Sequence, residues 1–253
     1  MTPELALGEL VAASGHGPAR APERGPMDGA PPPPSPFGNS INHTYFVLRR
    51  WVAILAILLP ITLWLGTAPV PQPSMSEYYH NPGGWMRDVF VGALWAVGFV
   101  LHFYKGYTRA ESIALTIAGF CAVMVAMAPM AWVPLHAWDC ANPRLIPASW
   151  GLHAVFAGTL FVMIAYVCIF RSGDTLQLLD DRKARAWFQR VYYVLGTLMV
   201  AVPLSELAIW YSGGMKPGSH IIFAIEAAGI WVFGTFWLVK SREIARIQAQ
   251  GAG

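Results

Sequence analysis

Long apolar runs alternate along this chain with short stretches rich in Pro, Gly and polar residues. Turn-forming segments mark the boundaries: "GTAPVPQP" follows the first run, "KGYTRAE" the second and "SGGMKPGS" the fifth. A spanning helix needs about 20 mostly apolar residues, and six runs meet this length. The pattern predicts an all-α polytopic membrane protein, a bundle of six transmembrane helices at residues 49–66, 87–105, 110–131, 150–170, 191–212 and 220–239.

The ends of the chain have a different pattern. Residues 1–44 contain "GHGPARAPERGPMDGAPPPPSPFGNS", which is rich in Pro and Gly and has no apolar period. Such a segment cannot bury a core, so we predict a disordered tail. The transmembrane domain is predicted at residues 45–240, and residues 241–253 form a short second tail.

The basic residues predict an orientation. If the N-terminus is cytoplasmic, fourteen Lys and Arg residues fall on the cytoplasmic side and three, Arg87, Arg144 and Lys216, fall outside. Loops on the cytoplasmic side carry the excess of Lys and Arg in membrane proteins. We therefore expect both termini in the cytoplasm.

Composition narrows the class of partner. The chain is 55% hydrophobic and 12% charged, whereas a soluble domain averages about 25% charged residues. The formal net charge of +3 is too small to indicate nucleic acid as a partner. The expected partners are membrane lipids, and other integral membrane subunits are a second possibility.

Several ionisable residues fall in the outer third of the predicted bilayer, on four different helices. At 1.5 Å of rise per residue, this group is Asp88, His153, Glu206, His220 and Glu226. The loop "SMSEYYH" at residues 74–80 lies directly above them. Ionisable groups at membrane depth usually face the bundle interior and a partner, so we expect these residues to converge.

The first interpretation of this group is a pocket that faces outward and binds a lipid headgroup or another small ligand without catalysis. Arg87 would contact a phosphate or carboxylate, with aromatic residues around it. The candidate ligand-binding residues are Ser76, Glu77, Tyr79, His80, Arg87, Asp88, Glu206 and Glu226. A role as an accessory subunit of a membrane complex stays open beside it, as does a purely structural role for each residue.

The alternative is a metal-dependent membrane hydrolase that acts on lipid amides or esters. Its zinc ligands would come from Asp88, His153, His220 and Glu226. The chain has no HExxH motif or similar local spacing. No cofactor is predicted outside this alternative. Ser74 or Ser76 as a nucleophile with His80 as its base is disfavoured, because no GxSxG elbow is present.

Three segments carry a family resemblance: "PSMSEYYH", "RDVFVGALWAVGFVLHFYKGY" and "IEAAGIWVFGTFWLVKS". They resemble a group of bacterial integral membrane proteins of unknown function, over residues of about 45–240. This likeness implies a multi-pass protein of the bacterial inner (cytoplasmic) membrane. The pattern is more distantly similar to the FRAG/DRAM group of six-helix proteins, which includes factors in GPI-anchor lipid remodelling and autophagy modulators.

A more remote resemblance is to ceramidase-type membrane metal hydrolases. Their Ser-x-x-x-His motif is matched by Ser76 and His80. Their late His-x-x-x-His pair is missing here, because Ala224 stands four residues after His220. That family also has seven spans where this chain has six, which argues against the same reaction.

Overall fold

A computed structural model of the chain describes residues 36–80, 84–128, 148–212 and 219–250. These residues are helical and contain no strand. The helices in chain order are α1 (Pro36–Gly66), the 3₁₀ turn η1 (Ser76–His80), α2 (Trp85–Phe103), α3 (Arg109–Met127), α4 (Ala148–Tyr166), the π-helical turn η3 (Val167–Arg171), α5 (Ser172–Leu176), α6 (Arg182–Tyr211) and α7 (Ile221–Gln250). Of the predicted disordered tail, residues 1–35 lie outside the described residues, whereas residues 36–44 form the start of α1.

Six helical stretches are long and apolar enough to cross a membrane, which confirms the predicted all-helical class and the six spans. They are His43–Gly66, Trp85–Phe103, Arg109–Met127, Gly151–Leu176, Arg182–Ile209 and Ile221–Gln250. α6 begins at Arg182, before the predicted start at residue 191, and α7 continues to Gln250, beyond the predicted end at residue 239. Both extensions lack Gly and Pro, so the helix continues after the apolar run has ended.

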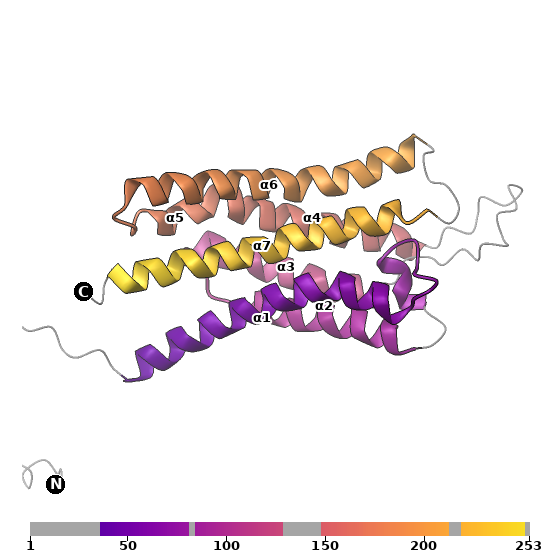
Figure 1. Ribbon diagram of the computed structural model, residues 1–253, viewed down its shortest axis with the longest axis horizontal. Helices are drawn as coiled ribbons and strands as arrows, with labels where there is room; N and C mark the ends of the chain where they lie inside the picture. Colours follow the sequence, from indigo (N-terminus) through magenta and orange to yellow (C-terminus); the bar gives the residue numbers. More distant parts are fainter. Residues whose placement is uncertain (1–35, 81–83, 129–147, 213–218, 251–253) are drawn as a thin grey trace, which may run out of the picture. The chain divides into compact units, whose positions relative to one another are not determined.

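Contacts divide the chain into Met1–Asn39 and Ser40–Gly253. In the second unit, successive long helices run in opposite directions (Figure 1). The connections at 104–108 and 177–181 lie at one end, which we call the basic end. Loop 67–80 lies at the opposite end, which we call the loop end.

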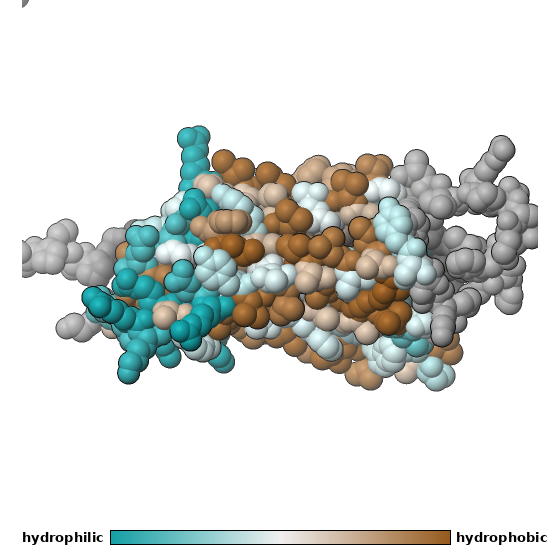
Figure 2. All heavy atoms as spheres, turned by 90° about the horizontal axis from the view of Figure 1, so that it is seen from above, coloured by the Kyte–Doolittle hydropathy of each residue, from teal (hydrophilic) through white to brown (hydrophobic). Residues whose placement is uncertain are grey.

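The surface of the described residues is apolar between these ends. Hydrophobic side chains cover the middle of the molecule and hydrophilic ones gather at one end (Figure 2). Large apolar side chains are exposed along the long helices, among them Trp51, Phe99, Val155 and Trp231. In water these side chains would favour association, whereas lipid chains cover them at no cost. The surface thus agrees with the six candidate spans.

Small residues let neighbouring helices approach closely. Gly119 on α3 faces Gly98 on α2: a Cβ atom added at Gly119 would lie 2.5 Å from the Gly98 carbonyl oxygen. At Gly234 on α7, an added Cβ would lie 3.1 Å from the Ile57 side chain on α1. Such contacts are the usual packing of membrane helices, where small residues permit close van der Waals contact.

Candidate functional site

Loop 67–80 is closed by a contact between its own two ends and is held against α7 by a packed ring and a backbone hydrogen bond. Tyr78 is fully buried, and its hydroxyl lies 2.9 Å from Thr67 Oγ1. The Phe223 N–H donates a hydrogen bond of 2.9 Å to the Pro73 carbonyl. This bond satisfies one of the amide groups that a helix leaves unpaired in its first turn. The loop therefore brings the residues after Pro73 directly against α7.

These residues surround the carboxyl group of Glu226. Ser74 Oγ lies 2.9 Å from each carboxyl oxygen, and the Met75 N–H donates to Oε2 at 2.5 Å. Ser76 Oγ lies 3.1 Å from Glu226 Oε1 and 3.0 Å from His153 Nε2. One loop thus joins an acid on α7 to an imidazole on α4. We call Ser74, Ser76, His153 and Glu226 the loop-end network.

Hydrogen-bond counting shows how protons can be arranged in this network. His153 Nδ1 lies 2.7 Å from the Ala128 carbonyl oxygen, which accepts only, so Nδ1 carries a proton. In a neutral ring Nε2 is then an acceptor and receives the Ser76 hydroxyl proton. Ser76 Oγ can in turn accept a hydrogen bond from a protonated Glu226 Oε1. The alternative arrangement moves one proton through Ser76, giving an imidazolium and a carboxylate.

The loop-end network is shielded from solvent. Ser74, Ser76 and His153 are buried and Glu226 is partly buried. Glu206, another predicted candidate, lies on α6 and is partly exposed. Because the network is shielded from water, the arrangement without separated charges is favoured.

The remaining predicted candidates lie apart from this network. Arg87 and Asp88 are exposed in the first turn of α2. The Arg87 guanidinium stacks on Tyr79, with Cζ 4.7 Å from the ring centroid, and Nη2 lies 3.4 Å from the tyrosine hydroxyl. His220 packs against Trp64, at 5.2 Å between ring centroids. Ser76, His153 and Glu226 therefore belong to the buried network, whereas Arg87, Asp88 and Tyr79 form a rim at the start of α2.

Two further candidates come from η1. Glu77 and His80 are partly exposed. Burial raises the pKa of the Glu77 carboxyl above its usual value, and the nearby His80 offsets part of this effect. Glu77 therefore keeps its proton at a higher pH than an exposed glutamate does.

The four predicted zinc ligands do not meet. In the described part of the chain, no three His, Cys, Asp or Glu side chains stand close enough together to hold a metal ion. His153 and Glu226 are joined through Ser76, whereas Asp88 is exposed and His220 packs on an aromatic ring. These side chains do not fit a tetrahedral zinc site, which takes at least three protein ligands.

A groove opens at loop 67–80, between the end of α1 and the start of α2. It has a volume of about 340 Å³. This is at the lower limit for a small-molecule site, about 300–1,000 Å³. Its lining combines apolar and polar groups: Gly66, Thr67, Ala68, Val70, Gln72, Trp85 and Met86. The groove shares Thr67 with the contact that anchors Tyr78, so it is built on the same loop.

A second buried network lies at the basic end, and none of its residues is among the predicted candidates. Lys240 Nζ lies 3.1 Å from Glu243 Oε2 and donates to Thr175 Oγ1 at 2.5 Å. Glu243 also accepts hydrogen bonds from Thr175 (2.5 Å) and from the Tyr192 hydroxyl. Lys240 is 2% exposed and Glu243 0%. The sequence did contain one indication of this pair: Lys240 and Glu243 are three residues apart, a spacing that brings opposite charges together on one face of a helix.

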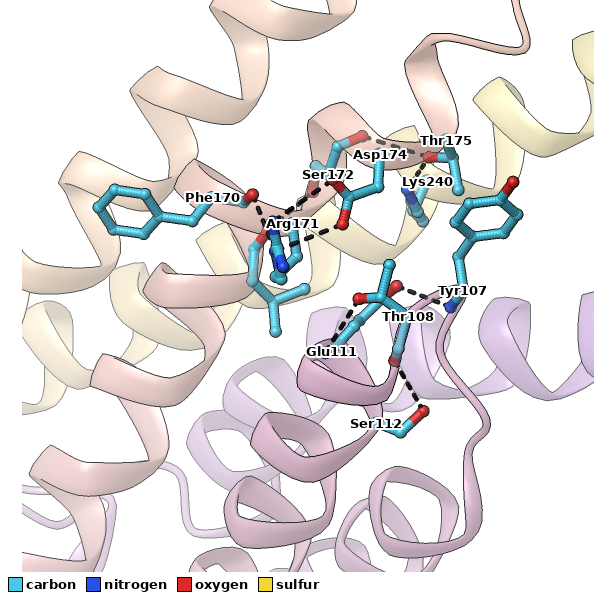
Figure 3. Close-up of polar contacts among 11 residues, drawn as sticks. Tyr107, Thr108, Glu111, Ser112, Phe170, Arg171, Ser172, Asp174, Thr175 and Lys240 are labelled. Atoms are coloured by element: carbon cyan, nitrogen blue, oxygen red, sulfur yellow. Dashed lines mark hydrogen bonds and ion pairs between the residues drawn. The ribbon is translucent and has the colours of Figure 1, made fainter.

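Figure 3 shows Lys240 and Thr175 facing each other near the turn that begins α3. Thr108 Oγ1 accepts a hydrogen bond from the Glu111 N–H at 3.3 Å, and Glu111 Oε2 accepts one from the Tyr107 N–H at 2.8 Å. Thr and Glu at this spacing are a capping box, so the "YTRAE" segment begins the helix. The Glu111 carboxylate is therefore hydrogen-bonded within this turn.

The fold defines the class: an all-helical protein with six helices that can cross a membrane. Comparison with protein-family models finds no match, and comparisons with curated proteins and with solved structures find no similar protein.

Proposed function

We propose that this chain is a multi-pass protein of the bacterial inner membrane, with both termini in the cytoplasm, that binds a lipid headgroup at its loop end. The orientation is supported by the excess of Lys and Arg at the basic end. An accessory-subunit role is the other form of this non-catalytic proposal.

The observation that carries the proposal is the groove beside loop 67–80. Trp85, Met86 and Val70 give it an apolar wall that suits an acyl chain, and Thr67 and Gln72 add polar groups. Tryptophan is typical of the membrane interface, where headgroups lie. A site that combines an apolar wall with a few polar groups is the usual form of a small-ligand site.

The rim beside the groove indicates which headgroup would fit. Arg87 and Asp88 are consecutive, exposed and opposite in charge, at the start of α2. A guanidinium binds phosphate through charge-assisted hydrogen bonds, and a carboxylate attracts an ammonium group. A zwitterionic headgroup such as that of phosphatidylethanolamine carries both partners.

Native mass spectrometry of the full chain in detergent, titrated with phosphatidylethanolamine, tests this proposal. We expect one bound lipid, and we expect Arg87→Gln to weaken its binding about tenfold, which corresponds to about 1.4 kcal/mol. The matched control is Arg190→Gln, an exposed arginine near the basic end, which should leave binding unchanged. Equal affinity in wild type and Arg87→Gln would refute the role of the rim, and no binding at all would refute the proposal.

A second candidate function is acyl transfer from a lipid ester or amide to Ser76. The observation that favours it is the Ser76–His153 pair: the hydroxyl lies 3.0 Å from Nε2, and the Ala128 carbonyl orients the ring through Nδ1. A nucleophile, its base and an orienting group are thus in place. In this step Ser76 Oγ would bond to the acyl carbon, its proton would pass to Nε2, and the leaving alcohol or amine would take that proton. Water would then hydrolyse the ester between Ser76 and the acyl group, which releases the acid and restores the serine hydroxyl.

A fluorophosphonate probe, which reacts with activated serines, tests the second candidate on the full chain in membranes. Under acyl transfer we expect the wild type and Ser74→Ala to be labelled and Ser76→Ala to lose the label. Ser74 is the matched control, because it lies in the same loop and contacts Glu226 but not His153. Absence of labelling in the wild type would leave only the binding function.

A further inference from the structure

Arg49 is a buried cation with unpaired donors. It stands on α1, six residues after the start of the span at His43, and is 6% exposed. Its Nε and Nη1 atoms are buried and have no hydrogen-bond partner among the residues that the structure describes. Buried polar groups are nearly always hydrogen-bonded, and arginine is almost never buried unless it is paired. These two donors therefore point to an acceptor that the described residues do not supply.

The groups around Arg49 do not neutralise it. Its Cζ atom lies 5.5 Å from the centroid of the Tyr104 ring. Burial raises the pKa of Tyr104 to about 12, although Arg49 opposes the shift, so the phenol stays uncharged at pH 7. The acids near Tyr104 are engaged elsewhere: Glu243 pairs with Lys240, and Glu111 accepts the hydrogen bond from Tyr107. Within the described ranges, the ion pairs are Arg171–Asp174 and Lys240–Glu243.

A second buried donor lies against the same tyrosine. Trp237 is 1% exposed, its ring centroid lies 5.2 Å from that of Tyr104, and its Nε1 also has no partner in the described part of the chain. Buried tryptophan N–H groups usually find an acceptor. Arg50, the next residue, behaves differently: it is exposed and stacks on Phe46, with Cζ 4.8 Å from the ring centroid.

The surroundings favour an anion. Residues 49–50, 105–111, 171–190 and 240–246, which meet at the basic end, contain twelve Lys and Arg against five Asp and Glu. This excess of positive charge attracts anions to the end of the bundle where Arg49 lies. Arg49 is about 9 Å along the helix axis from His43, a depth that a phospholipid headgroup can reach from the membrane surface. Basic pockets between membrane helices are a known form of headgroup site.

We propose that Arg49 binds a phosphate group at the basic end, supplied by an anionic phospholipid of the adjoining leaflet. The phosphate oxygens accept hydrogen bonds from Nε and Nη1 and give the guanidinium its counter-charge. Arginine suits this role because it is weakly hydrated and offers several donors in a fixed plane. The site is separate from the loop-end groove and does not depend on the function proposed for that groove.

Thermal unfolding of the full chain in an uncharged detergent tests the proposal with three additives: phosphatidylglycerol, phosphatidylcholine and inorganic phosphate. We expect phosphatidylglycerol to raise the melting temperature of the wild type by about 5 °C at roughly 100 times its Kd. The same shift should appear in Arg50→Gln, the matched control, and be lost in Arg49→Gln. Phosphatidylcholine should have a much smaller effect.

The outcomes separate the sources of phosphate. Stabilisation by phosphatidylglycerol alone identifies a lipid, and an equal shift with inorganic phosphate identifies a free anion bound by the same residue. The proposal is overturned if Arg49→Gln responds like the wild type, or if neither phosphate source stabilises the wild type. Should Arg49→Gln fail to fold, Arg49→Lys replaces it: this variant keeps the charge but loses the guanidinium plane, and we expect at most half the shift. A full shift in Arg49→Lys would count against the guanidinium site.

Discussion

Replacement of Lys240 by methionine should destabilise the protein by about 3–5 kcal/mol, the usual cost of removing one partner of a buried ion pair. The variant leaves the Glu243 carboxyl fully buried, with hydroxyl donors from Thr175 and Tyr192 but no cation. The apparent melting temperature in detergent, followed by tryptophan fluorescence, should fall by about 10 °C.

The double variant Lys240→Met/Glu243→Gln decides whether the lost charge pairing is the cause. It removes both charges and keeps an amide that can bond to the two hydroxyls, so it should be more stable than Lys240→Met alone. Lys183→Met, at an exposed lysine, should stay within about 0.5 kcal/mol of the wild type. A Lys240→Met protein as stable as the wild type would show that the buried pair does not exist in the membrane protein.

Replacement of Glu226 by leucine should cost about 3 kcal/mol or more. The change leaves the Ser74 hydroxyl and the Met75 N–H without their acceptor and breaks the link to Ser76. A buried donor without a partner costs about 1–3 kcal/mol. Hydrogen exchange gives a local measurement: the Met75 amide should exchange faster, because it opens with the loop.

Glutamine at position 226 distinguishes the two proton arrangements of the loop-end network. In the neutral arrangement Glu226 donates to Ser76, and a glutamine amide can do the same, so Glu226→Gln should cost about 1 kcal/mol. The control is Glu206→Gln, a partly exposed acid on α6, with an expected change below about 0.5 kcal/mol. If Glu226→Gln loses as much stability as Glu226→Leu, the network contains an imidazolium and a carboxylate instead.

Hydropathy predicted the six spans because each has to exclude water over the thickness of a bilayer. Hydropathy did not predict that α6 and α7 continue beyond the apolar runs. Lys240 and Glu243 lie past the predicted end of the last span, yet they are buried among α6, α5 and α7. A hydropathy profile along the sequence predicts that charged residues near the end of a span are exposed to solvent. Their burial depends on the neighbouring helices, which such a profile does not include.

The candidate site was predicted in part for a related reason. Depth along the membrane normal predicted Glu226 and His153 at one level, and the structure joins them through Ser76. Depth says nothing of rotation about a helix axis, where each residue turns by about 100°. Asp88 at the same predicted depth is exposed, and His220 faces Trp64. The role of Ser74 needed the path of the loop, which no periodicity describes.

The bonds between loop 67–80 and α7 have a consequence for how the protein is made. Ser74 and Glu226 are 152 residues apart in the chain. A ribosome adding about 5–20 residues per second needs about 8–30 s to pass from one to the other. During this interval the loop has been synthesised but lacks its acceptor, so Ser74 and the Met75 amide must remain hydrated. The loop end is therefore completed only once α7 has been synthesised, and a nascent chain that ends before α7 has no such site.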